Sequence, residues 1–203
     1  MSWKNFLKGL RWVGIGLVGL FIIAVIIRIP HSYNVQKTNE QVAKIHATKL
    51  TLDDVMGENL PPDPGAEADK TIEGIDANKN GIRDDVELAI FKEYPNSAKT
   101  RAVLLQYALA LQMEVTQPIV NKETVTEVVR EQSRGYICVG KVLPREDIAK
   151  YMIEGKKLRS FVTEVQRNTL DREKYRKDFV ENVGSYSESE NEVCDIDLST
   201  LLN

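Results

Sequence analysis

The residues best suited to chemistry form one short run of oxygen-bearing side chains. From Asp76 to Asn80 an acid or an amide stands at every second position, and further acids follow Gly81. Ca²⁺ is a hard ion that takes about six to eight oxygen ligands, and a tight loop with a glycine at its sharpest turn supplies them. The expected ligands are Asp76, Asn78, Asn80, the backbone carbonyl of Ile82, Asp84 and Glu87.

This spacing, DxNxNGxxDxxE, resembles the EF-hand-like calcium loops of bacterial surface proteins and of thrombospondin type 3 segments. The resemblance covers residues 76–87 and implies Ca²⁺ as the cofactor, with Glu87 as a bidentate ligand. Asn78 and Asn80 stand where the family has carboxylates, and fewer charged ligands imply weaker binding. The resemblance therefore implies a structural calcium site more than a signalling sensor.

A turn followed by the start of a helix is the alternative for the same run. Asn80-Gly81 favours a turn, and Asp84 and Glu87 suit the positive end of a helix dipole. That alternative explains the glycine and the later acids. It does not explain the regular spacing of Asp76, Asn78 and Asn80, so we expect a calcium loop.

The chain after this loop is expected to be helical, because its apolar residues repeat at helical spacing. Tyr94-Pro95 should end the first helix, and Asn96 or Ser97 should cap the second. The sequence predicts about five helices around one core. Their apolar stripes begin near Val86, Val103, Val125, Ile148 and Leu170.

The chain has two cysteines, Cys138 and Cys194. Neither has a neighbouring cysteine or histidine at the spacing of a zinc or redox motif. A disulfide is expected if the domain lies outside the cytoplasm, and it would stabilise the fold by roughly 4 kcal/mol. Two reduced, buried thiols are the alternative for a cytoplasmic domain.

The N-terminal segment has the composition of a membrane span. Residues 12–27 carry no charge, and Arg11 and Arg28 flank them. Lys4, Lys8 and Arg11 precede the run, so the N-terminus should stay in the cytoplasm. A cleaved signal peptide is the alternative, but no small-x-small cleavage site follows.

These observations predict a mainly α protein with a single N-terminal transmembrane helix and one compact helical domain. Residues 1–29 would form a cytoplasmic tip and anchor, 30–69 a stalk and Pro-rich linker, and 70–203 an extracytoplasmic (periplasmic or extracellular) domain. Pro61, Pro62 and Pro64 favour the linker.

Composition excludes some functions and leaves others open. A net charge of -3 and a pI near 5.6 are untypical of a nucleic-acid binder. The histidines, His31 and His46, both fall in the expected stalk, and no catalytic motif stands out. We expect a membrane-anchored, calcium-binding structural or protein-interaction domain of the cell envelope, with an envelope protein as a possible partner. The alternatives are a calcium- or ligand-responsive membrane sensor subunit and an envelope enzyme with an unrecognised active site.

Overall fold

The computed structural model describes residues 3–185 and 193–201, and this part of the chain is mainly helical, as predicted. The α-helices are α1 (Trp3–Ala47), α2 (Leu52–Met56), α3 (Asp84–Glu93), α4 (Ala98–Thr116), α5 (Lys122–Val139), α6 (Ile148–Gln166) and α7 (Leu170–Val180). Three short 3₁₀ turns accompany them: η1 (Gly65–Asp69), η2 (Gly140–Val142) and η3 (Leu198–Thr200). Helices α3 to α7 correspond to the five predicted apolar stripes.

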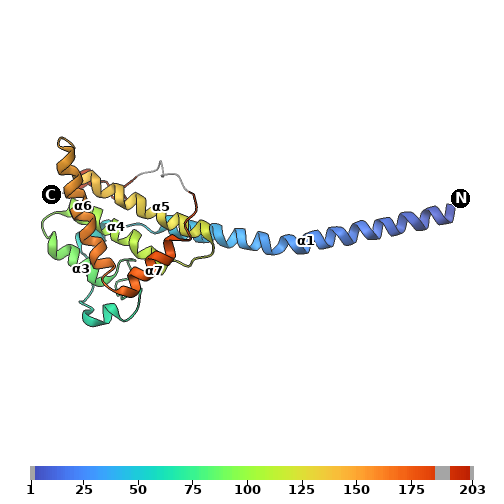
Figure 1. Cartoon of the computed structure of the whole chain (residues 1–203), viewed down its shortest axis with the longest axis horizontal. Coiled ribbons are helices and arrows are strands. Elements are labelled where there is room, and N and C mark those ends of the chain that lie inside the picture. The colour runs from blue at the N-terminus through green and yellow to red at the C-terminus, as the bar shows by residue number, and fades with distance from the viewer. Residues whose placement is uncertain (1–2, 186–192, 202–203) are drawn as a thin grey trace. The chain divides into compact units, whose positions relative to one another are not determined.

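Helix α4 is the centre of the body (Figure 1), and α2, α3, α5 and α6 all contact it. Every residue from Arg101 to Glu114 is buried. A helix that is covered on all sides needs apolar residues all round. The sequence provides them in the run Ala102–Leu105 and again from Tyr107 to Leu111.

Helix α5 packs tightly against α4 at Gly135. A Cβ atom at Gly135 would lie 3.1 Å from the Cα atom of Tyr107 and 3.4 Å from the carbonyl oxygen of Gln106. The missing side chain thus allows the two helix backbones to approach each other.

Side-chain caps set where the helices begin. Ser97 accepts a hydrogen bond from the backbone N–H of Thr100, as one of the two predicted caps of α4. Asn121, Asp147 and Thr169 cap α5, α6 and α7 in the same way. Each cap satisfies a backbone donor that would otherwise have no partner at a helix start.

The predicted transmembrane span is wrong. In the part of the chain that the structure describes, no helix is long and apolar enough to cross a membrane. The uncharged run 12–27 amounts to about 24 Å of helix, which is less than the roughly 30 Å of a hydrocarbon core. It belongs to α1, which continues through polar residues to Ala47. Large apolar side chains of this run, among them Trp12 and Phe21, are exposed.

Two further expectations depended on that span. The membrane as a partner of the chain and a single-pass location in a cell membrane are both corrected by the same finding.

The chain divides into two compact units, Met1–Glu40 and Gln41–Asn203. Residues expected to form a stalk and linker contribute to the second unit. Ile45, Leu50 and Val55 are buried in its core, and Gln41 donates a hydrogen bond of 2.8 Å to Gln117. The predicted Pro-rich segment contains α2 and η1.

Candidate functional site

The loop 76–87 is organised around the carboxylate of Asp76. Its two oxygens accept the backbone N–H groups of Asn80 at 3.1 Å and of Gly81 at 2.9 Å. Two residues adopt left-handed backbone, Lys79 at φ 60° and Gly81 at φ 84°. The chain therefore turns sharply where the calcium-loop pattern has its glycine.

Glu87 lies in the first turn of α3 and is 1% exposed. Its carboxylate accepts hydrogen bonds from the Nδ2 atoms of Asn78 at 3.1 Å and of Asn80 at 3.0 Å. Burial raises the pKa of Glu87 to about 7, although these two hydrogen bonds oppose the shift. No lysine, arginine or histidine among the described residues forms an ion pair with it.

Asp84 is also buried, at the start of α3. Its side chain accepts the backbone N–H of Ala77 at 3.0 Å, and its own N–H donates to the carbonyl of Ile75 at 2.8 Å. Burial raises the pKa of Asp84, and the nearby charges of Asp76 and Asp85 add to the shift. Asp84 and Glu87 are therefore two buried acids for which negative charge is unfavourable.

The expectation of an assembled calcium-binding site is not met in this conformation. Among the residues that the structure describes, no three His, Cys, Asp or Glu side chains are placed together to hold a metal ion. The physical reason is that each acid faces other partners: Asp76 and Asp84 accept backbone N–H groups, and Glu87 accepts two amides.

The donor set nevertheless has the chemistry that Ca²⁺ requires, because all six expected ligands are oxygens. Half of them are the amide oxygens of Asn78 and Asn80 and the carbonyl of Ile82. Asn78 and Asn80 present nitrogen to Glu87, and a half-turn of each amide group would present oxygen instead. Ca²⁺ binding by this loop stays a prediction.

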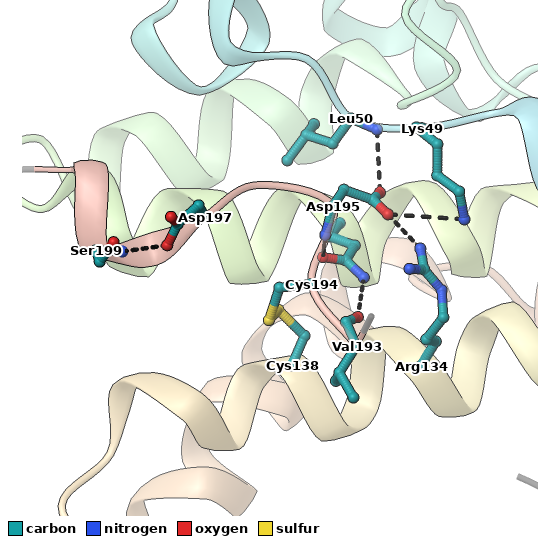
Figure 2. The surroundings of a disulfide bond; sticks show 10 residues. Lys49, Leu50, Arg134, Cys138, Val193, Cys194, Asp195, Asp197 and Ser199 are labelled. Carbon is teal, nitrogen blue, oxygen red and sulfur yellow. Dashed lines mark hydrogen bonds and ion pairs between the residues drawn. A yellow bond between two sulfur atoms is a disulfide. The ribbon is translucent and has the colours of Figure 1, made fainter. Parts of the chain in front are cut away.

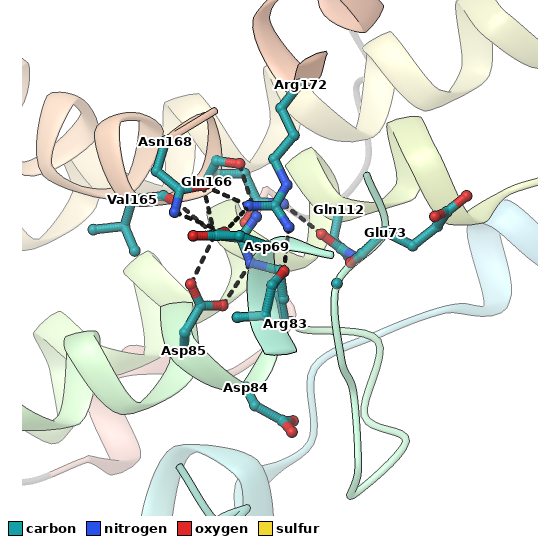
Figure 3. A network of polar contacts seen from close by, with 12 residues as sticks. Asp69, Glu73, Arg83, Asp84, Asp85, Gln112, Val165, Gln166, Asn168 and Arg172 are labelled. Atoms are coloured by element: carbon teal, nitrogen blue, oxygen red, sulfur yellow. Dashed lines mark hydrogen bonds and ion pairs between the residues drawn. The ribbon is translucent and has the colours of Figure 1, made fainter. Parts of the chain in front are cut away.

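Two buried arginines hold the loop and the segment that precedes it (Figure 3). Arg83 is fully buried and donates to both carboxylate oxygens of Asp85, at 2.5 and 2.9 Å. It also donates to the carbonyl oxygens of Val165 at 2.7 Å and of Gln166 at 3.1 Å. Arg83 therefore ties the start of α3 to the end of α6.

Arg172 of α7 does the same for the segment before the loop. Its guanidinium donates to the carbonyl oxygens of Ala68, Thr71 and Ile72 and to Asp69. The hydrogen bond from Arg172 lowers the pKa of Asp69. Through backbone carbonyls, Arg172 fixes the path of the chain that enters the loop, and Arg83 anchors the last part of the loop to α6.

The structure contains the disulfide between Cys138 and Cys194 that the sequence predicts (Figure 2). It joins the end of α5 to the segment that follows residue 192, with Cα atoms 5.2 Å apart. Beside it, Asp195 forms an ion pair with Arg134 and accepts the backbone N–H of Leu50 at 3.1 Å. The bridge and these contacts hold residues 193–195 against the body.

The sequence interpretation missed a charged cluster around His46. This residue, expected in the stalk, lies 3.1 Å from Glu127 and 2.9 Å from Glu131 on α5. Lys49 contacts Glu131 at 3.1 Å. Burial would raise the pKa of Glu131, but the hydrogen bond from His46 and the charges of Arg134 and Lys49 outweigh it and lower that pKa. Glutamates four residues apart share a helix face, but the sequence does not reveal what that face contacts.

Comparisons of the chain with protein-family models, with curated proteins and with solved structures found no match.

Proposed function

We propose that residues 41–203 form a structural or protein-interaction domain of an oxidising compartment, stabilised by a Ca²⁺ ion in the loop 76–87. The observation that carries the proposal is the carboxylate of Glu87. It is 1% exposed, two amide side chains face it, and no cation among the described residues pairs with it. A buried acid without a cation is costly, and a bound divalent ion would remove that cost.

The ion would be held by the backbone carbonyl of Ile82 and by five side chains: Asp76, Asn78, Asn80, Asp84 and Glu87. The ion would supply positive charge between buried acids and would join the loop to the first turn of α3. Ile82 is itself fully buried, and Arg83 binds the end of α6. These neighbours support a role in stability, because the ligand residues are continuous with the core.

The disulfide supports the assignment of the domain to an oxidising compartment. Such bonds persist in oxidising environments and are rare where thiols are kept reduced. Here the bond joins two buried or half-buried positions of one core. Its place in the core fits a permanent structural role.

Thermal unfolding with and without Ca²⁺ tests the proposal. We expect millimolar Ca²⁺ to raise the Tm by several degrees over the value in chelator, since a ligand that binds only the folded state stabilises it. Glu87→Gln should abolish the response. Glu58→Gln, the same change at an exposed position outside the loop, should keep it. An identical Tm in chelator and in 5 mM Ca²⁺ would refute the ion's role.

A further inference from the structure

A groove lies between α5 and α6. Its volume is about 500 Å³, which lies within the range of ligand sites. Tyr136 of α5 lies on one side, and α6 supplies the rest of the lining: Met152, Ile153, Lys156, Arg159, Ser160, Thr163 and Glu164. From Met152 to Glu164 the groove follows α6 for about 18 Å.

The apolar part of the groove is unusually open to solvent. Met152 is 63% exposed and Ile153 is 66% exposed. Ile148, one turn before Met152, is 64% exposed and extends the same apolar strip. Contiguous exposed apolar surface of this kind marks interaction sites.

The positive charges of the groove lack acidic partners. Most arginines of the body bind acids or carbonyls, as Arg83, Arg134 and Arg172 do. By contrast, neither Lys156 nor Arg159 forms an ion pair with an acid within residues 3–185 and 193–201.

Arg159 is held in place by an aromatic ring. Its guanidinium carbon lies 3.9 Å from the centre of the Tyr136 ring, a cation–π distance. Gly155 leaves room for this arrangement, because a Cβ there would lie about 3 Å from the guanidinium nitrogens. Stacking on a ring leaves the edge of a guanidinium free to bind a carboxylate with two hydrogen bonds.

We propose that this groove binds an acidic amphipathic segment of a partner protein, with its apolar side chains on Met152 and Ile153 and a carboxylate on Lys156 and Arg159. The length of the groove along α6 suits a short helix or strand laid beside it. Glu164 lies further along α6, so the segment's acid should lie at the end nearer to Lys156. The inference gives a partner class to the interaction role proposed above, and it does not depend on Ca²⁺.

The test is selection of random twelve-residue peptides displayed on phage against the full chain, followed by fluorescence anisotropy with the selected peptides. We expect enrichment of Asp or Glu beside Leu, Ile or Phe. The double variant Lys156→Gln/Arg159→Gln should weaken binding at least tenfold. The matched double variant Lys150→Gln/Lys157→Gln changes two exposed lysines of α6 outside the groove and should bind within twofold of the unchanged chain.

Three results would overturn the proposal: no enrichment, selected peptides without an excess of acids, or equal weakening by both double variants. A dimer in sedimentation that Met152→Glu dissociates would make a second copy of this chain the occupant, and would overturn it as well. Melting each variant with and without Ca²⁺ separates the two proposals. The groove variants should keep the rise in Tm with Ca²⁺. Failure of the peptide-binding proposal would therefore leave the calcium proposal standing, and the reverse also holds.

Discussion

Glu87 should make the stability of the metal-free protein depend on pH near neutrality. Its pKa is about 7 when folded, against 4.5 for an unperturbed glutamate. The folded state therefore binds the proton more tightly, and this contribution is complete below about pH 4.5 and is lost as the pH rises through 7. We expect the free energy of unfolding in chelator to fall by up to about 3 kcal/mol between pH 5 and pH 8.

Urea unfolding at a series of pH values measures this effect. Glu87→Gln should reduce the fall in the free energy of unfolding with rising pH. The fall that remains should come from Asp84, whose pKa is also raised. Asp69 and Glu131 have lowered pKa values. Their contributions are present above their ordinary pKa values and are lost only in more acidic solution. An unchanged slope in Glu87→Gln would contradict the assignment.

Arg83 should be among the most sensitive residues of the body. Replacing it with Leu would leave Asp85 and the carbonyls of Val165 and Gln166 without their donor. Removal of one partner from a buried ion pair costs about 3–5 kcal/mol. Lysine should not rescue the loss, because it cannot reproduce the fork of donors.

Chemical denaturation of Arg83→Leu and Arg83→Lys measures the loss. Arg130→Gln is the control, because Arg130 is only partly buried and pairs with Glu127 three residues away on the same helix. Pairs of that kind contribute about 0–1 kcal/mol. If Arg83→Leu and Arg130→Gln lost the same free energy of unfolding, burial of the arginine would not determine the energetic cost of replacing it.

Among single residues, the regular spacing of Asp76, Asn78 and Asn80 is visible in one short run of the sequence, and the Ca²⁺ binding that it indicates stays a prediction. The sequence does not predict that Asn78 and Asn80 donate to Glu87. An amide has both an acceptor oxygen and a donor nitrogen, and the spacing of residues does not tell which of them faces the acid. Nor did it show that His46 meets Glu131, which is 85 residues further along the chain. Such contacts depend on the packing of helices.

Among the elements, the crossing of α4 and α5 should be the least tolerant of added volume. Gly135→Leu would force side-chain atoms against the backbone of α4 at Tyr107. Overpacking of this kind costs about 1–3 kcal/mol or more, which exceeds the roughly 1 kcal/mol gained in helix propensity.

Guanidinium unfolding of Gly135→Leu measures the balance. Gly14→Leu serves as the control, because it makes the same change in a helix with nothing within 4 Å of the new Cβ. If Gly135→Leu were as stable as the unchanged chain, the close approach of the two helices would be wrong.

The helices α3 to α7 were predictable because local signals agree: apolar spacing, a proline at Tyr94-Pro95 and the cap at Ser97. The prediction for the N-terminal element is wrong, because the uncharged part of its apolar run is too short for a membrane span. The last turn of α1 and the short α2 fall in the segment for which the sequence predicts a stalk and linker. Their buried residues, Ile45 and Val55, are too widely spaced to form a stripe.

For the molecule as a whole, residues 41–203 should fold without the first unit. Among the side chains whose burial the structure describes, the buried apolar ones run from Ile45 to Leu201 and belong to the second unit. A chain that begins at Gln41 should therefore unfold at the same denaturant midpoint as the full chain.

A chain that begins at Thr51 is the matched comparison. It would lose Ile45 and Leu50 from the core, together with the contacts of His46 and Lys49 to Glu131. Circular dichroism during denaturation should show a clear loss of stability for this shorter chain. Non-cooperative unfolding of the chain from Gln41 would contradict the division into units.

The position of the disulfide has a consequence for proteolysis. The bond between Cys138 and Cys194 closes a covalent ring that contains both α6 and α7. A protease that cuts once anywhere in that ring opens it without separating the chain into two molecules. Arg83 donates to carbonyl oxygens of α6, and Arg172 belongs to α7, so both arginines have contacts with the ring. Because the disulfide keeps the cut chain together, these contacts would stay within reach. Single cleavage in the ring would therefore stay invisible on a gel until a reductant is added.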